Sequence, residues 1–235
     1  SIDAQPRFSH RSNPEKLVND LVSFVTSTRT CSHEDWIKGH QFRWLVIFGH
    51  YLGPLQFISR AMRKIYDVSF KNFYTDLLSY SEKNPHTYIG KEYLTIKNNL
   101  TKILKNERHW GDVIPGCGDI NWEVDEATSI RLVKGKDTFY QEMSNYLEIK
   151  YDMDKRVLKD IIKYQKARLH QPNVKYPIEK TFDYNIHDVI ENNKNLKTKE
   201  NVQTFTGKYF DNLYEWAKNT LWFGRRIARY KTKVK

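Results

Sequence analysis

The strongest constraint in this sequence is a helical stripe of apolar side chains in its first third. Between positions 37 and 65 large apolar residues recur first after seven residues and then every three or four, the spacing of one helix face. They are Ile37, Trp44, Phe48, Tyr51, Leu55, Ile58, Met62 and Ile65. Gly53 and Pro54 interrupt the stripe, and a proline cannot donate the backbone hydrogen bond that a continuous helix needs. The pattern therefore predicts two helices or one kinked helix.

Polar residues mark where several helices begin. Ser32 is followed by Glu34 and Asp35, which is typical of an N-cap with carboxylates in the first turn. Ser69 and Asp154 occupy similar positions. Apolar periodicity then predicts helices over 70–81, 88–106, 122–133, 136–150, 154–169, 187–193 and 205–230. Between them we expect a Gly-rich loop (111–121), an extended strap around two prolines (172–177) and a polar linker (192–204).

These elements predict a mostly α fold. Residues 17–235 should form a single globular helical domain of about eight or nine helices, preceded by an irregular N-terminal extension over 1–16. The segment 17–28 is rich in β-branched residues, and it predicts either one short N-terminal strand or a helix ending near Val25. With only 10 Gly and 7 Pro, a turn-dense all-β architecture is disfavoured.

Charge and composition exclude several classes. The 39 basic and 28 acidic residues give a net charge of +11. The sequence contains no apolar run of about 20 residues, as a membrane span would require, and its N-terminus does not resemble a secretory signal. Only two cysteines occur, Cys31 and Cys117, too few for a disulfide framework. We expect a cytoplasmic protein, and the N-terminus without methionine suggests a piece of a longer chain.

Motifs for self-sufficient catalysis are missing from the sequence. The eight histidines form no H-E-x-x-H pair, and neither a nucleophile elbow nor a phosphate-binding glycine loop occurs. Glycines flank Cys117 and would let a ligand approach the backbone, although a cysteine in a flexible turn is the favoured interpretation. From Arg225 onward six of eleven residues are basic. A solvated terminus explains them best, and a phosphate, nucleic-acid or membrane contact is the alternative.

A series of short motifs runs over residues 24–230. They read TRTCSHEDW at 28–36, GHYLGPLQFISRA at 49–61, VSFKNFY at 68–74, GDINWEVDEA at 118–127, DTFYQEM at 137–143, KYQK at 163–166 and WFGRR at 222–226. In content and order this series resembles the region after the barrel in cobalamin-binding-domain radical S-adenosylmethionine proteins.

The resemblance implies a C-terminal accessory region, because the parent family's cluster motif C-x-x-x-C-x-x-C and its cobalamin motif D-x-H-x-x-G are absent here. This chain would be non-catalytic, covering the barrel and holding part of a substrate. S-adenosylmethionine, an iron–sulfur cluster and, in some members, cobalamin would belong to the parent protein. Expected partners are its barrel and cobalamin domains and an anionic small-molecule substrate. The motifs select as contact candidates Trp36, Arg43, Trp44, Trp122, Glu123, Arg225 and Arg226, for which helix capping and inter-helix bonding is the structural alternative.

Two other classes remain open from sequence. The positive charge and 33 aromatic residues would suit a nucleic-acid-binding protein, although acids and bases alternate through 76–200 and no helix-turn-helix or zinc pattern occurs. A peripheral membrane or scaffold protein could use the aromatic stripe of 36–66, although such a stripe is more often core. An excised cap should also expose an apolar patch where the barrel belongs.

Overall fold

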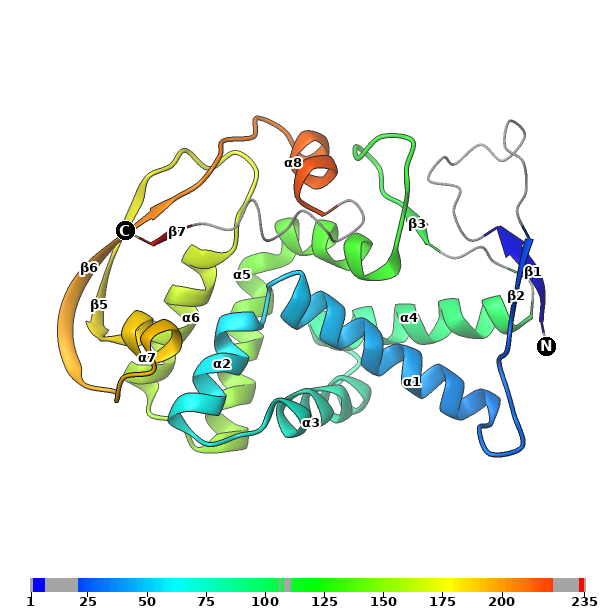
Figure 1. Ribbon diagram of the computed structural model, residues 1–235, viewed down its shortest axis with the longest axis horizontal. Coiled ribbons are helices and arrows are strands. Elements are labelled where there is room, and N and C mark those ends of the chain that lie inside the picture. Colours follow the sequence, from blue (N-terminus) through cyan, green and yellow to red (C-terminus); the bar gives the residue numbers. More distant parts are fainter. Residues whose placement is uncertain (1, 7–20, 106, 108–110, 222–232, 235) are drawn as a thin grey trace.

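Helices make up most of the computed structural model, which describes residues 2–6, 21–105, 107, 111–221 and 233–234 (Figure 1). The helices are α1 (His33–Val46), the π-helical turn η2 (Ile47–Tyr51), α2 (Gln56–Ile65), α3 (Phe70–Lys83), α4 (Tyr88–Leu104), α5 (Val124–Tyr151), α6 (Lys155–Arg168), α7 (Ile186–Asn192) and α8 (Leu213–Thr220). The strands are β1 (Ile2–Pro6), β2 (Leu21–Phe24), β3 (Asp112–Val113), β4 (Asn121–Trp122), β5 (Ile178–Tyr184), β6 (Thr198–Thr206) and β7 (Lys233–Val234). The prediction of a mostly α single domain is confirmed.

The predicted start of α1 is correct in detail. Ser32 accepts a hydrogen bond from the Asp35 backbone N–H at 3.1 Å, and the Asp35 carboxylate accepts one from the Ser32 backbone N–H at 2.9 Å. This reciprocal pair is a capping box. The apolar stripe then continues through η2 and breaks before α2, where Gly53 adopts φ +109°, a conformation that favours glycine. Two helices with a break between them were one of the predicted outcomes.

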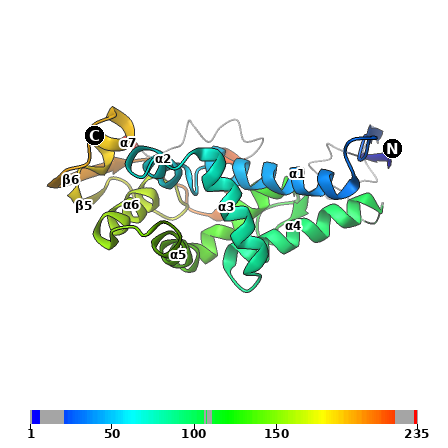
Figure 2. The same ribbon diagram turned by 90° about the horizontal axis from the view of Figure 1, so that it is seen from below.

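The four N-terminal helices pack against each other and against α5. Figure 2 shows α1 and α4 running side by side with α3 crossing beneath them, and contacts join α1 to both. Ser69 caps α3 by accepting from Asn72 N at 3.0 Å, as predicted. Tyr51 of the apolar stripe is 51% exposed, and Phe70 at the start of α3 is 42% exposed. The ring of Phe70 rests edge-on against His50, with 5.3 Å between ring centroids.

One continuous helix, α5, replaces the two helices predicted over 122–133 and 136–150. The predicted gap at 134–135 contains Gly135, but this glycine lies within the helix. A Cβ at position 135 would lie 2.3 Å from Cε2 of Tyr88. Gly135 therefore makes room for the Tyr88 ring against α5, and its place in the sequence reflects packing instead of a helix end.

The C-terminal third differs most from the prediction. The predicted polar linker 192–204 contains most of β6, which pairs antiparallel with β5, and β7 pairs with β6. The predicted helix 205–230 was wrong over its first part, since residue 205 belongs to β6 and the described helix is α8; residues 222–230 lie outside the described residues. Phe182 on β5 and Phe205 on β6 are both fully buried and contact the Tyr164 ring. Burial of these two rings explains why the hairpin closes on α6.

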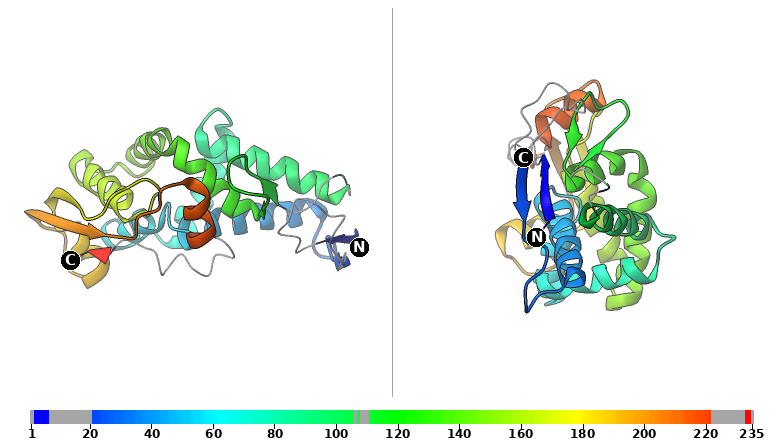
Figure 3. Two further views of the ribbon diagram at one scale, coloured as in Figure 1. Left: turned by 90° about the horizontal axis from the view of Figure 1, so that it is seen from above. Right: turned by 90° about the vertical axis from the view of Figure 1, so that its right-hand side faces the viewer.

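Two short antiparallel pairs complete the fold. β1 pairs with β2, so the predicted N-terminal strand is present, and its partner lies within the segment 1–16 that was expected to be irregular. β3 pairs with β4 across the Gly-rich loop. Figure 3 shows the β5–β6 hairpin and the β1–β2 pair at opposite ends of an elongated body, with α8 over its middle.

The interior contains two hydrophobic clusters. The larger cluster lies among α1–α6, α7 and the β5–β6 hairpin. The smaller one joins the Gly-rich loop, the first turns of α5 and α8, and it contains Cys117, Trp122, Ile130 and Trp216. Within the described part of the chain, no helix combines the length and apolar character that crossing a membrane requires.

Candidate functional site

Trp44, one of the predicted contact residues, is an interior anchor of α1. It is 0% exposed, and its indole Nε1 donates to Thr128 Oγ1 at 3.1 Å. That hydroxyl lies 3.1 Å from Oε2 of Glu92. Arg131 donates to the same carboxylate, from Nη2 to Oε2 at 2.7 Å and from Nε to Oε1 at 2.9 Å. Arg131 also reaches Asp112 Oδ2 at 3.2 Å. This network joins α1, α4, α5 and β3, so Trp44 performs the inter-helix bonding that was the alternative to substrate contact.

Trp122 is also an interior residue. Its ring is 0% exposed, and its Nε1 donates to the Cys117 carbonyl at 3.3 Å. The Cys117 side chain is fully buried as well, and burial raises the pKa of its thiol. A Cβ on Gly118 would lie 2.4 Å from the Tyr214 ring. The space beside Gly118 is therefore filled by a side chain of α8, whereas the space beside Gly116 is open.

A buried carboxylate, Asp125, brings two further candidates together. Asp125 lies in the first turn of α5, is 6% exposed, and its Oδ1 has no hydrogen-bond partner among the described residues. Burial raises the pKa of Asp125 to about 6; the nearby Arg43 guanidinium lowers it and Glu123 raises it further. Trp36 lies apart from them on α1, with its ring 4.2 Å from that of His40. Arg43 and Glu123 thus share one electrostatic neighbourhood.

A small cavity between α1 and α4 lies beside this group. Its volume is about 10 Å³, and His40, Arg43 and Asn99 are the polar residues that line it. The Asn99 side chain is 7% exposed, and its Nδ2 has no partner among the described residues. Because about 10–15 Å³ is the least that holds one water, a single water is the occupant that fits. The cavity is too small for a substrate.

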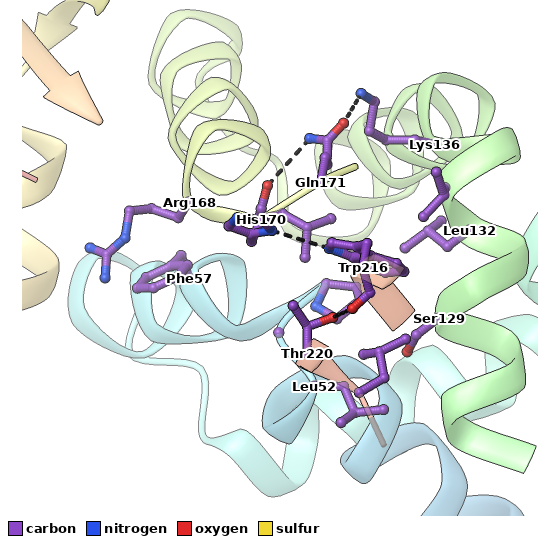
Figure 4. A pocket seen from close by; sticks show the side chains of 15 residues that line it. Leu52, Phe57, Ser129, Leu132, Lys136, Arg168, His170, Gln171, Trp216 and Thr220 are labelled. Atoms are coloured by element: carbon purple, nitrogen blue, oxygen red, sulfur yellow. Dashed lines mark hydrogen bonds between the residues drawn. The ribbon is translucent and has the colours of Figure 1, made fainter. Parts of the chain in front are cut away.

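An apolar pocket lies where α2, α5, α6 and α8 meet (Figure 4). Its volume is about 30 Å³, which is room for one or two water-sized groups. Leu52 and Phe57 come from the η2–α2 region, Leu132 from α5, and Trp216 from α8. The lining is mainly apolar, so this pocket would hold an apolar substituent by excluding water.

The polar groups around the apolar pocket are already engaged with each other. Trp216 Nε1 donates to His170 Nδ1 at 3.1 Å, and His170 Nε2 lies 2.7 Å from the Lys208 carbonyl. Burial lowers the pKa of His170. Lys136 donates to the Gln171 side-chain oxygen, and the bond bridges α5 to the segment after α6 (Figure 4). These groups can orient a ligand, and none is arranged as a nucleophile with a base.

Arg168 lies at the far side of the same pocket. Its guanidinium is 4.2 Å from the centre of the Phe57 ring and donates to Glu191 Oε1 at 2.9 Å. It also bonds the Tyr164 hydroxyl, and that hydroxyl lies 2.9 Å from His187 Nδ1. Arg168 shares the Glu191 carboxylate with Arg60, whose Nη1 lies 3.1 Å from Oε2, so its contacts hold α6 to α7 and α2.

Sequence reasoning did not select the residues of the apolar pocket. Arg225 and Arg226, two of the predicted contact candidates, lie outside the described residues. A signal for His170 and Gln171 did exist: they are polar residues directly after a helix and before Pro172, where chain breaks often position functional groups. The role of Trp216 could not be anticipated, because its partner His170 is 46 positions away.

Neither thiols nor metal ligands are gathered in this region. Cys31 and Cys117 are both free. Among the residues that the structure describes, no group of three or more His, Cys, Asp or Glu is placed to hold a metal ion. Comparison with protein-family models gave no match for this chain, and comparison with curated protein sequences gave none either.

Proposed function

We propose that this chain is a non-catalytic accessory domain of a radical S-adenosylmethionine enzyme, which covers the barrel and holds part of the substrate. The supporting observation is that the apolar pocket is built from segments that carry or adjoin the motifs of the resemblance. Residues 52–57 belong to the motif at 49–61, and residues 168–171 follow the motif at 163–166. Residues 216–221 directly precede the motif at 222–226.

The chemistry of the apolar pocket favours binding of a substrate group over catalysis. Apolar walls exclude water, which protects radical intermediates from side reactions. The His170 imidazole is bonded through both nitrogens, so it has no free position from which to move a substrate proton. We therefore assign the pocket to an apolar part of the substrate, and assign bond-making to the parent protein.

The residues present do not fit an iron–sulfur cluster. Such clusters take three or four cysteine ligands, whereas this chain has two, Cys31 in the turn before α1 and Cys117 buried in the Gly-rich loop. In the proposal, S-adenosylmethionine, the cluster and any cobalamin are bound by the barrel and cobalamin domains. Two free thiols suit a reducing compartment, and we propose a cytoplasmic location.

The exposed apolar residues define what the barrel contact would look like. Eight large hydrophobic side chains are exposed in the described part of the chain, each on a different segment. They are Val25, Tyr51, Phe70, Leu94, Val113, Ile149, Val202 and Tyr209. Because these residues lie on different elements, an apolar patch formed by them would span several elements of the fold. We propose a contact of mixed polarity, as is common between domains.

Isolation of the native protein tests this function. An antibody raised against the purified chain would capture the native polypeptide from source cells, and its mass, iron and acid-labile sulfide would be measured. We expect a mass well above that of 235 residues, with iron and sulfide in equal amounts. Antibody pre-adsorbed with the purified chain is the control. A polypeptide of the chain's own mass without iron would overturn the proposal.

A further inference from the structure

A second, larger hollow lies between α6, β5 and the segment 169–176. Its volume is about 590 Å³, within the range of about 300–1,000 Å³ that is usual for small-molecule sites. Its lining within the described part of the chain includes five lysines and no carboxylate. They are Lys136, Lys159, Lys163, Lys166 and Lys180. We call this hollow the lysine groove.

The backbone explains why the lysines converge. Lys159, Lys163 and Lys166 are spaced four and three residues apart on α6, so they occupy one helix face. Lys180 lies on β5 two residues after Ile178, and alternate residues of a strand point to the same side. The intervening Glu179 points away and receives a hydrogen bond from Thr204. The lysine side chains therefore line the groove, whereas Glu179, the neighbouring acidic residue on β5, lies on the other side of the strand.

Internal ion pairs neutralise only part of this charge. Lys163 lies 3.0 Å from the buried Asp160, and Lys166 lies 2.6 Å from Asp137. The Asp137 side chain is 81% exposed, so water and salt screen that pair. Lys136 bonds a neutral amide. For Lys159 and Lys180 the described residues supply no acidic partner. The groove therefore retains a net positive charge.

The floor of the groove is apolar and adjoins the apolar pocket. Ile162, Val174 and Ile178 contribute aliphatic surface between the lysines. Lys136 and Leu169 line both hollows, as does Gln171. The hydrogen bond from Lys136 to Gln171 lies at this shared wall (Figure 4). An occupant with an apolar body and an anionic group would satisfy both surfaces.

We propose that the lysine groove binds a small organic anion with an apolar body, its charged group held among the lysines. A nucleic acid is the less suitable occupant, because single strands bind on a series of stacking aromatic rings. Among the described lining residues only Tyr176 is aromatic, and its ring already stacks on His170 with 5.4 Å between centroids. This inference stands independently of the radical-enzyme proposal.

A matched pair of fluorescent probes tests the site on the full chain. One probe is 8-anilinonaphthalene-1-sulfonate, and the other is N-phenyl-1-naphthylamine, which has the same apolar body without the charge. We expect saturable binding of the sulfonate at one site per chain, at least about tenfold tighter than the neutral amine, a ratio worth about 1.4 kcal/mol. Equal affinity for both probes would refute an anion-selective groove.

Charge-neutral variants locate the bound probe. The double variant K159Q/K180Q removes the two lysines without acidic partners, and we expect it to weaken sulfonate binding about tenfold, in line with two exposed charge contacts. The control K71Q/K91Q removes the same charge from exposed positions on α3 and α4, and it should change binding less than twofold. Equal losses in both variants would mean that only net charge matters.

Competition with an oligonucleotide tests whether the groove binds nucleic acid instead of a small molecule. A 20-nucleotide single strand should displace the sulfonate only weakly at about 150 mM salt, where screening is strong. Tight displacement that falls steeply with added salt would assign the groove to nucleic acid, and would overturn the small-molecule inference.

Discussion

The indole N–H of Trp216 donates to Nδ1 of His170 at 3.1 Å, and this bond fixes the protonation of the imidazole. Because Nδ1 accepts, the proton resides on Nε2, which donates to the Lys208 carbonyl at 2.7 Å. A second proton on Nδ1 would face the indole N–H. Burial lowers the pKa of His170, and burial together with Arg168 lowers the pKa of His187. Both histidines are therefore kept neutral by the fold.

The neutral histidines predict a loss of stability in mild acid. Below the ordinary histidine pKa of about 6.5 the unfolded chain binds protons that the folded chain does not. The two histidines should therefore lower the free energy of unfolding as the pH drops from 7.5 to 5.5, against an opposite contribution from Asp125, and urea unfolding measures their sum. His170→Gln should flatten this dependence, whereas His86→Gln, at an exposed position, should leave it unchanged. Identical slopes in the two variants would contradict the argument.

Asp125→Asn should stabilise the protein at neutral pH. The pKa of Asp125 is raised from 3.8 to about 6, so the folded state holds its proton more tightly than the unfolded state. Stability from this group is present at low pH and is lost as the pH rises through about 4 to 6. We expect the variant to gain about 1–3 kcal/mol at pH 7.5. The gain should vanish near pH 4, and a loss at pH 7.5 would show that attraction to Arg43 outweighs burial.

Two glycine substitutions in helices should have opposite effects. In Gly135→Ala the new methyl would lie 2.3 Å from the Tyr88 ring, and such overpacking costs about 1–3 kcal/mol. In Gly39→Ala nothing lies within 4 Å of the new methyl, so better helix propensity should stabilise by up to about 1 kcal/mol. Thermal unfolding of both variants measures the difference. Equal shifts would mean that the Tyr88 ring moves aside freely.

The buried network around Glu92 should matter more for stability than any surface pair. Glu92→Gln leaves Arg131 with Asp112 alone, and we expect a loss of about 1–3 kcal/mol in urea unfolding. Glu34→Gln breaks the exposed pair with Lys38, whose atoms are 2.8 Å apart, and it should leave the midpoint unchanged. The network would be dispensable if both variants unfolded at the same urea concentration.

Local rules predicted the helix starts and the break in the first third of the chain. The caps at Ser32, Ser69 and Asp154 depend on hydrogen bonds to neighbouring residues, so the sequence alone contains the information. Gly135 was misread because its role depends on Tyr88, 47 positions away along the chain. The β5–β6 hairpin was missed because only a few of its residues are buried, so its strands lack a strong alternating pattern.

The functional surfaces were harder to predict because they, too, depend on contacts between residues that are far apart in the sequence. Trp122 stood out within a motif and Trp44 within the apolar stripe, but only the fold shows that both are interior. The apolar pocket draws on segments more than 100 residues apart. For the lysine groove the spacing of Lys159, Lys163 and Lys166 was visible in the sequence, whereas the approach of β5 to the same helix was not.

The continuous α5 helix has a consequence for local unfolding of this protein. Its 28 residues span about 42 Å. Ala127 and Ile130 lie in the smaller hydrophobic cluster, whereas Phe139 and Leu147 lie in the larger one. One continuous series of helical backbone hydrogen bonds therefore packs against both clusters. Local unfolding of either cluster would also break hydrogen bonds of the helix that supports the other. Slow amide hydrogen exchange should therefore extend along the whole helix as one cooperative unit.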